Sequence, residues 1–312
     1  MGKTESRRTA TNANRREAIR TFAVGVAAAM LAAPRLHSEE AATAAKRVAI
    51  TIDDGPAVGT GDDFEAFASI SGRIRDAFVA AKAPAIMFVN EQQLHVDGQR
   101  DARAKVLEAW LEAGLDLGNH TYSHFNLGDV ELSDYLDDIV KGEVITRPLM
   151  RSRGRELTWF RYPYLAAGDG EKAETVEAFL AERDYRVAPV TVSYADYSFA
   201  SNYARMIRSG ESAEAEKIAR EVDKAAAAAF ARAERQSQEL LRYQLPQILL
   251  IHCNELNART LPDMLEFIRG LGYEFTSIER AMEDPAYQTH GMPSGSMGGS
   301  FFNGLAKAAE RQ

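Results

Sequence analysis

Acidic and histidine side chains follow several apolar runs of this sequence. The run 48–52 leads into Asp53 and Asp54, His120 and His124 stand four residues apart, and His252 ends another apolar run. Two histidines at this spacing can converge on one metal ion if the segment coils as a single turn. With one carboxylate they leave a coordination position open for water, while the second carboxylate and third histidine could act as base and acid. The pattern predicts a catalytic metal centre.

Each feature alone also has an ordinary structural explanation. Asp53, Asp54 and Gly55 could simply begin a turn, and two histidines in a loop can both be exposed. A single histidine after an apolar strand, such as His252, is often a structural residue. The elements that position these residues therefore decide between the two interpretations.

Apolar runs typical of strands alternate with segments of helical periodicity. Continuous apolar strands separated by amphipathic helices indicate a parallel sheet covered on both faces, as in a barrel or a doubly wound sheet. In a parallel barrel the carboxyl ends of all strands open on one face, where active sites are built. The expected strands are 48–52, 85–89, 115–117, 157–160, 185–192, 248–251 and 273–276, and the expected helices are 64–82, 102–113, 132–150, 172–183 and 260–271.

Residues 1–45 are expected to be a signal peptide. Arg15 and Arg16 precede an uncharged run at 21–34, too short for a membrane-spanning helix, and Ala42-Thr43-Ala44 suits a cleavage site. The residues around Arg15 loosely resemble a twin-arginine signal, with an ordinary secretory signal or an uncleaved anchor as alternatives. An exported, periplasmic protein without a stable membrane span in its mature form follows from this interpretation.

The remaining chain, 46–287, is expected to form one domain because no Pro/Gly-rich linker divides it. Residues 198–245 interrupt the strand–helix alternation with a helical insertion, since 211–242 is rich in Ala, Glu, Lys and Arg. The charges of this insertion are expected to form a solvated face. The Gly/Ser-rich tail 288–312 is expected to pack loosely.

Composition excludes several classes of protein. The 312 residues include one Cys, which rules out an internal disulfide framework and a cysteine-based zinc site. The formal net charge of −8 argues against nucleic acid as the main partner, because phosphate binding needs a basic face. A hydrophobic fraction of 46% is too high for a disordered chain.

Five motifs together carry a family resemblance. They lie, in order, at 51–56, 120–124, 161–164, 193–197 and 250–252. This arrangement resembles the polysaccharide deacetylase family, also called the NodB-homology or carbohydrate esterase family 4 fold. The resemblance implies an α/β fold, a distorted (β/α)7–8 barrel of the NodB-homology type, here with a helical insertion before the last motif. It also implies metal-dependent removal of acetyl groups from a carbohydrate.

The resemblance assigns roles to individual residues. Asp53 matches the general base that activates a metal-bound water. Asp54, His120 and His124 match the metal ligands. The ion that the resemblance implies is divalent, with zinc as the first choice. His252 matches the general acid that protonates the leaving group.

The same resemblance assigns supporting roles around these groups. Arg161 matches the arginine that orients the catalytic aspartate, and the backbone N–H of Tyr164 matches an oxyanion donor. Asp196 matches a carboxylate that supports both the catalytic histidine and this arginine. Leu250 matches the lining of the acetyl pocket, and Tyr197 is expected to line the apolar side of the site.

Departures from the family pattern leave the substrate open. The fourth motif lacks its first acid at Ser193 and has Tyr197 where tryptophan is usual, and Leu165 stands where glycine is frequent. Asn254 and Asn257 are weaker candidates for substrate contact. The leading hypothesis is a hydrolase that removes N-acetyl, or alternatively O-acetyl, groups from a glycan. A non-catalytic glycan-binding protein that keeps the fold and metal, or a hydrolase of a small non-polymeric amide, are the alternatives.

Overall fold

The computed structural model of this chain describes residues 45–289 and 300–309. The expected signal peptide, with its twin-arginine segment, falls outside the described residues except for Ala45. No helix in the described ranges combines the length and the apolar character needed to cross a membrane.

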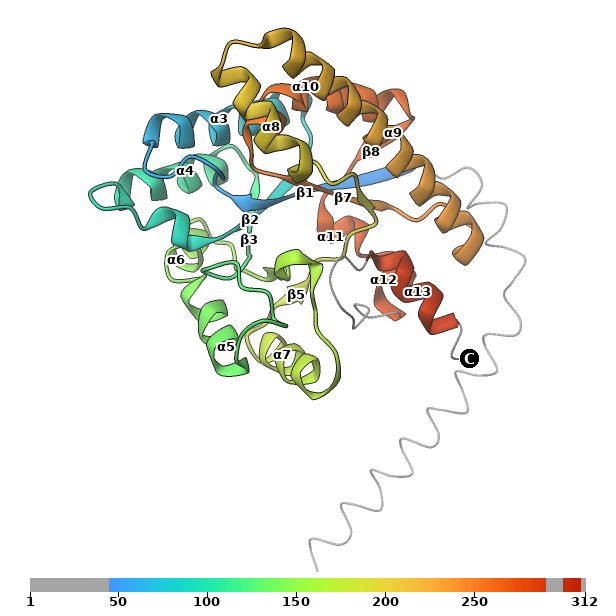
Figure 1. Ribbon diagram of the computed structural model, residues 1–312. Coiled ribbons are helices and arrows are strands. Elements are labelled where there is room, and N and C mark those ends of the chain that lie inside the picture. Colours follow the sequence, from blue (N-terminus) through green and yellow to red (C-terminus); the bar gives the residue numbers. More distant parts are fainter. Residues whose placement is uncertain (1–44, 290–299, 310–312) are drawn as a thin grey trace, which may run out of the picture. The chain divides into compact units, whose positions relative to one another are not determined.

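The described chain is organised around one sheet of eight parallel strands (Figure 1). Seven strands run in the order β5-β4-β3-β2-β1-β7-β6, and β8 pairs with the first residues of β1. Parallel neighbours need crossover connections, and helices supply most of them. The strands are β1 (Lys46–Gly55), β2 (Ala85–Val89), β3 (Asp116–Asn119), β4 (Trp159–Phe160), β5 (Arg186–Val187), β6 (Val192–Ser193), β7 (Gln247–His252) and β8 (Tyr273–Phe275).

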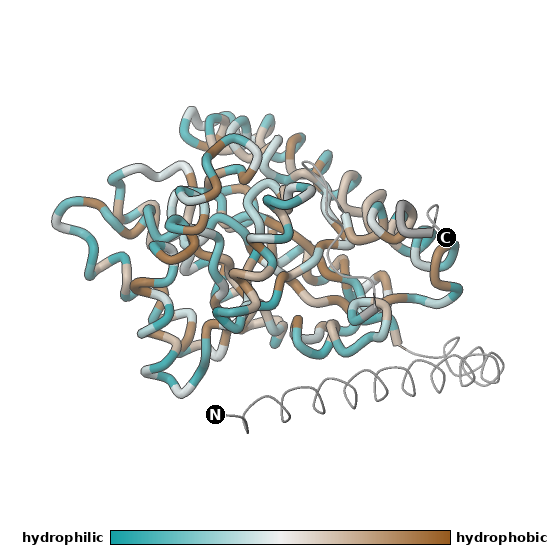
Figure 2. The backbone as a smooth tube through the Cα atoms, turned by 90° about the horizontal axis from the view of Figure 1, so that it is seen from below, coloured by the Kyte–Doolittle hydropathy of each residue, from teal (hydrophilic) through white to brown (hydrophobic). Residues whose placement is uncertain are grey.

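The central strands are buried on both faces. Every residue of β1 from Val48 to Asp53 is buried, as is the whole of β2. Helices surround these strands, and hydrophilic residues predominate in the outer loops (Figure 2). Burial on both faces explains why these strands are continuous apolar runs in the sequence instead of alternating patterns.

The sheet forms a half-barrel that stays open between β5 and β6. The sequence pattern predicts one strand over 185–192, whereas two short strands form at its ends. Pro189 lies between them and has no N–H to donate to a sheet, which accounts for the interruption. The predicted distorted barrel of parallel strands and helices is confirmed in this open form.

Most helices begin and end within two residues of the expected positions. The helix predicted at 260–271 begins earlier, at Glu255, because the side chain of Asn254 caps it by accepting from the N–H of Asn257. The predicted helix 132–150 is two helices, separated at Gly142. The carboxylate of Glu91 accepts hydrogen bonds from the backbone N–H groups of Ile145 and Thr146, so it caps the second helix. The helices around the sheet are α3 (Phe64–Ala81), α4 (Arg100–Glu112), α5 (Leu132–Lys141), α6 (Thr146–Ser152), α7 (Gly170–Glu182), α10 (Glu255–Gly270) and α11 (Ile278–Ala281), with short 3-10 turns η1 (Glu91–Leu94) and η2 (Pro163–Leu165).

Two helices occupy the segment predicted as an insertion. They are α8 (Tyr197–Arg208) and the long α9 (Ser212–Leu241). The two helices contact each other, and α9 also contacts the edge strand β6. Val222, Ala226 and Phe230 of α9 recur at four-residue spacing and are buried, while most charged residues of the helix face outward. The division of the chain into a signal, a domain with an insertion and a tail stays a prediction.

Part of the C-terminal segment is packed, against expectation. After α12 (Pro285–Thr289), residues 301–309 form α13 (Phe301–Ala309), in which Phe301 and Phe302 are buried. The backbone N–H of Phe301 donates to the carbonyl of Val190 at 2.8 Å, beside the opening of the half-barrel. The expectation of loose packing is wrong for this helix. Its apolar residues, which follow the Gly/Ser-rich stretch, pack against the rest of the domain.

We predict that Gly142→Ala lowers the free energy of unfolding by about 1–3 kcal/mol, the usual effect of overpacking. A Cβ atom here would lie 2.7 Å from the carbonyl carbon of Thr121 and 2.9 Å from the backbone nitrogen of Tyr122, both in the loop that carries His120. Urea denaturation followed by circular dichroism measures the change.

Gly72→Ala in α3 is the matched control. The nearest atom to a Cβ there lies 4.0 Å away, so alanine should raise the free energy of unfolding by about 0.5–1 kcal/mol through its better helix propensity. A Gly142→Ala protein as stable as the wild type would contradict the packing of this loop.

Candidate active site

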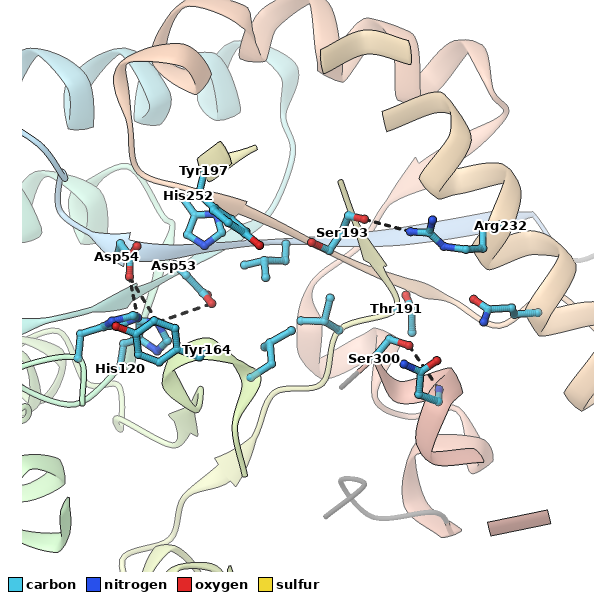
Figure 3. A pocket seen from close by; sticks show the side chains of 16 residues that line it. Asp53, Asp54, His120, Tyr164, Thr191, Ser193, Tyr197, Arg232, His252 and Ser300 are labelled. Carbon is cyan, nitrogen blue, oxygen red and sulfur yellow. Dashed lines mark hydrogen bonds and ion pairs between the residues drawn. The ribbon is translucent and has the colours of Figure 1, made fainter. Parts of the chain in front are cut away.

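The predicted site residues meet around one pocket of about 740 Å³ at the carboxyl ends of the strands (Figure 3). Arg161 and Asp196 are buried immediately behind its wall. The other eight predicted residues line it directly, and they are Asp53, Asp54, His120, His124, Tyr164, Tyr197, Leu250 and His252.

Three of these side chains have the geometry of a metal site. One ligand atom each of Asp54, His120 and His124 lies within 4.8 Å of the others. Asp54 Oδ1 is 3.6 Å from His120 Nε2 and 3.2 Å from His124 Nε2. Ligands of a tetrahedral zinc ion at 2.0–2.2 Å stand about 3.4 Å apart, so the spacing fits. Asp54 Oδ1 is also buried without a hydrogen-bond partner, which an ion at this position would supply.

The environment of His120 prepares its Nε2 atom for an ion. Its Nδ1 lies 2.7 Å from the carbonyl oxygen of Arg161, so Nδ1 carries the proton and Nε2 has a free lone pair. Burial lowers the pKa of His120 well below its ordinary 6.5, with a further contribution from His124. Burial also lowers the pKa of His124. Both imidazoles are therefore neutral near pH 7, as metal ligands must be.

Asp53 is held beside this cluster by a buried arginine. The Arg161 Nη1 atom lies 3.4 Å from both Asp53 oxygens, and Nη2 donates to Thr51 Oγ1 at 3.0 Å. Burial raises the pKa of Asp53 to about 6, although the charges of Arg161 and His252 oppose the shift. Asp53 is thus a carboxylate at neutral pH, with a basicity well above that of an exposed aspartate.

His252 lies beside Asp53, as its register partner on the neighbouring strand β7, and is paired with Asp196. Asp196 Oδ1 lies 2.8 Å from His252 Nδ1. Burial alone would lower the pKa of His252, but the charge and hydrogen bond of Asp196 outweigh it and raise the pKa to about 9. Conversely, burial would raise the pKa of Asp196, and the contacts with His252 lower it. Near pH 7 the pair is an imidazolium beside a carboxylate.

Two asparagines complete the surroundings of Asp196. The side-chain amides of Asn257 and Asn254 donate to Asp196 Oδ2 at 2.5 and 3.2 Å, and the backbone N–H of His252 donates to it at 2.9 Å. These asparagines were weak candidates for substrate contact, whereas both hold the carboxylate behind His252. The contacts of Arg161 are with Thr51, Asp53 and the Pro189 carbonyl, so the expected support by Asp196 concerns the histidine.

Several site residues have a backbone conformation that ordinary side chains rarely adopt. Asp54, His124 and Tyr164 have φ values of 60°, 59° and 58°, and Thr121 and Ala195 in the neighbouring loops have 62° and 54°. Such residues persist only where the surrounding structure holds them, and they cluster at functional sites. Here the conformation turns the chain sharply after a strand, so that the ligand side chains face the pocket.

Aromatic and aliphatic side chains line the walls near these groups. Tyr164 packs against His124 with ring centroids 4.5 Å apart, and Tyr197 packs against His252 at 5.3 Å. Both tyrosines are more than half exposed, at 51% and 61%. Leu250 is buried and lines the pocket, as expected.

The pocket extends to residues that sequence analysis did not single out as site residues. They come from the segment around β6 just before the insertion, from α9 within it and from the tail. For α9 and the tail, charges and Gly/Ser-rich composition indicate a solvated surface. The polar residues of this extension are Thr191, Ser193, Arg232, Gln236, Ser300 and Asn303.

Comparison with known proteins finds the same family that the motifs indicate. The family model for polysaccharide deacetylases matches residues 40–188. This region includes Asp53, Asp54, His120, His124 and the Arg161 motif.

A curated relative and a solved structure agree with this match. A chitin deacetylase of Arthroderma benhamiae is 29% identical over 154 residues, which is 49% of this chain and 36% of that protein. The match thus spans about a third of its length. The Xyl-CE4 domain of a multidomain xylanase from the hindgut metagenome of Trinervitermes trinervoides has the same fold, with a TM-score of 0.51, 16% identity, and coverage of 77% of this chain and 91% of that one. The family resemblance of the motifs is confirmed for residues 40–188, which match the polysaccharide deacetylase family model.

Proposed function

We propose that this protein is a metal-dependent hydrolase that removes N-acetyl groups from a carbohydrate. The observation that carries the proposal is a three-ligand cluster, Asp54, His120 and His124, in one pocket with the carboxylate of Asp53 and the imidazolium of His252. The matched family and the name of the curated relative support a carbohydrate as the substrate.

Asp54, His120 and His124 would hold the ion, for which we propose zinc. Two imidazoles and one carboxylate form the ligand set of several catalytic zinc sites. The ion would lower the pKa of a water molecule toward about 7 and polarise the acetyl carbonyl.

Asp53 acts as the general base in this proposal. Its carboxylate lies beside the cluster, 3.7 Å from His120 Nε2, and accepts the proton of the attacking water. Arg161 fixes its orientation through contacts with both oxygens. The backbone N–H of Tyr164 is assigned as a donor to the oxyanion that forms on the substrate, where a preorganised donor contributes about 2.7–4 kcal/mol.

His252 acts as the general acid. Hydrolysis of an amide expels a strongly basic amine, which must be protonated as the carbon–nitrogen bond breaks. The pair with Asp196 keeps His252 protonated near neutral pH and places Nδ1 toward Asp196, leaving Nε2 for the substrate. An ester has a better leaving group, so the acid matters less for O-acetyl than for N-acetyl substrates.

Tyr164 and Tyr197 offer exposed ring faces on either side of the cluster to a sugar substrate. The proposal also includes export to the periplasm, which rests on the signal expected at 1–45. An acetylated cell-wall glycan or a chitin-like oligomer would be accessible there.

We predict that Asp53→Asn and His252→Ala each lower kcat for acetate release by about 10²–10⁴-fold, the usual contribution of general base or acid catalysis. The assay uses metal-loaded protein with N-acetylated amino-sugar oligomers and acetylated xylan. Asp97→Asn, an exposed aspartate outside the pocket, is the control.

Undiminished turnover in either variant would contradict the assigned role. Binding of the oligomers by wild-type, metal-loaded protein without any release of acetate would favour a non-catalytic glycan-binding protein. Release confined to small acetamides would favour the alternative of a non-polymeric amide.

We further predict that Asp196→Asn moves the alkaline limb of the pH profile of kcat/KM to lower pH by more than about one unit. The variant loses the charge that stabilises the imidazolium of His252, and a loss of about 1.36 kcal/mol already lowers the pKa by one unit. The limb reports deprotonation of the general acid. Burial lowers the pKa of His252 and Asp196 raises it, so removing the charge must lower it. An unmoved limb would mean that His252 is not the acid.

Asp263→Asn is the control for this profile. Asp263 is an exposed aspartate of α10, the helix that also carries Asn257, and its replacement should leave the limb in place.

A further inference from the structure

The pocket has two chemically different ends (Figure 3). One end holds the carboxylates and imidazoles of the candidate active site. The other is made of hydrogen-bonding side chains from the loop and strand at β6, from α9 and from α13. In Figure 3, Ser193 and Arg232 lie on the opposite side of the view from Asp54 and His120. The second end requires its own explanation, because none of its polar groups takes part in the proposed reaction.

Arg232 is the cation of this second end. Its Nη2 atom donates to the backbone carbonyl of Ser193 at 3.3 Å, which anchors the guanidinium beside β6. A guanidinium has five N–H donors in a fixed planar arrangement, so most of them remain for a ligand. The side chain lines the pocket and is exposed to it.

Several cations of α9 are neutralised by ion pairs within that helix. Lys217, Arg220 and Lys224 each pair with a glutamate of the same helix. Within the described ranges, no ion pair includes Arg232 or Arg235. Of these last two residues, Arg232 lines the pocket and Arg235 does not.

Neutral donors and acceptors from separate elements line the pocket together with the guanidinium. Gln236 lies one turn further along α9 and therefore on the same face of the helix as Arg232. Ser300, directly before α13, and Asn303 of α13 also line the pocket. This helix is attached to the chain before β6 through the Phe301–Val190 hydrogen bond. A site assembled from several elements can surround a bound group instead of touching it from one side.

Apolar side chains also line the pocket, among them Leu165, Val190 and Leu250. Leu250 connects the two ends, because it is the register partner of Ser193 and precedes His252 by two residues on β7. Arg232 attracts a substrate carboxylate to the second end. A substrate with an acyl bond at one end and a carboxylate beyond an apolar portion can therefore occupy both ends at once.

We propose that Arg232 binds a carboxylate of the substrate, so that the preferred substrates are acetylated carbohydrates that also carry a carboxylate. The inference rests on the proposed function for the position of the reacting bond. One guanidinium balances a single negative charge, and the net charge of −8 disfavours more highly charged anions.

The test uses a matched pair of probes. One is an N-acetylated amino-sugar oligomer that bears carboxylates, and the other is the same oligomer with its carboxylates converted to methyl esters. The ratio of kcat/KM for the two probes is measured with metal-loaded protein. We expect wild type to prefer the carboxylated probe and Arg232→Ala to lower the ratio by about 10–100-fold, as for loss of a hydrogen bond to a charged group.

Two further variants distinguish a specific contact from a general effect of charge. Arg232→Lys keeps the charge without the planar arrangement of donors and should lower the ratio less than Arg232→Ala does. Arg235→Ala removes an exposed cation of the same helix and should leave the ratio unchanged. Equal kcat/KM values for both probes in wild type, an unchanged ratio in Arg232→Ala, or an equal loss in Arg235→Ala would each overturn the proposal.

Calorimetric binding of both probes to metal-loaded Asp53→Asn protein, with and without Arg232→Ala, separates this inference from the proposed function. If the carboxylated probe binds more tightly and this difference depends on Arg232, the proposed carboxylate contact is supported even when wild type releases no acetate. If wild type releases acetate but binds both probes equally well, the proposed function stands and the carboxylate contact is overturned.

Discussion

The buried guanidinium of Arg161 connects the charged parts of the candidate active site. It contacts both oxygens of Asp53 and the hydroxyl of Thr51. The backbone carbonyl of the same residue accepts a hydrogen bond from His120 Nδ1. One residue after β4 therefore orients the proposed base on β1 and sets the tautomer of a proposed ligand after β3. Because a buried cation left without partners is strongly unfavourable, these contacts also hold the strand ends in place.

Opposite shifts in pKa follow from this arrangement. Burial raises the pKa of Asp53 to about 6, and the pairing with Asp196 raises the pKa of His252 to about 9 against the effect of burial. Between these values Asp53 is a base and His252 an acid. The two neutral histidines beside them suit an ion, so each titratable group has a protonation state that matches its proposed part in amide hydrolysis.

Residues that directly follow strands could be predicted from the sequence, because parallel strands bring their carboxyl ends to one face. The sequence pattern placed Asp53, His120 and His252 on that face, and all three line one pocket in the structure. Arg232 and Asn303 could not, since their place in the pocket depends on how α9 and α13 pack across the open edge of the half-barrel. A charged residue on a long helix and a polar one after a Gly/Ser-rich stretch have the same local pattern whether they face solvent or a pocket. The sequence does contain Pro189, which interrupts the strand pattern between β5 and β6 and so indicates where the sheet is open.

Acetate release from an N-acetylated amino-sugar oligomer, measured before and after removal of metal, tests the central claim most directly. The account predicts that a chelator abolishes release, that zinc restores it in wild type, and that restoration fails in His120→Ala, which lacks one of three ligands. The exposed His95→Ala serves as the matched control and should recover fully. Undiminished release by metal-free protein would contradict the account.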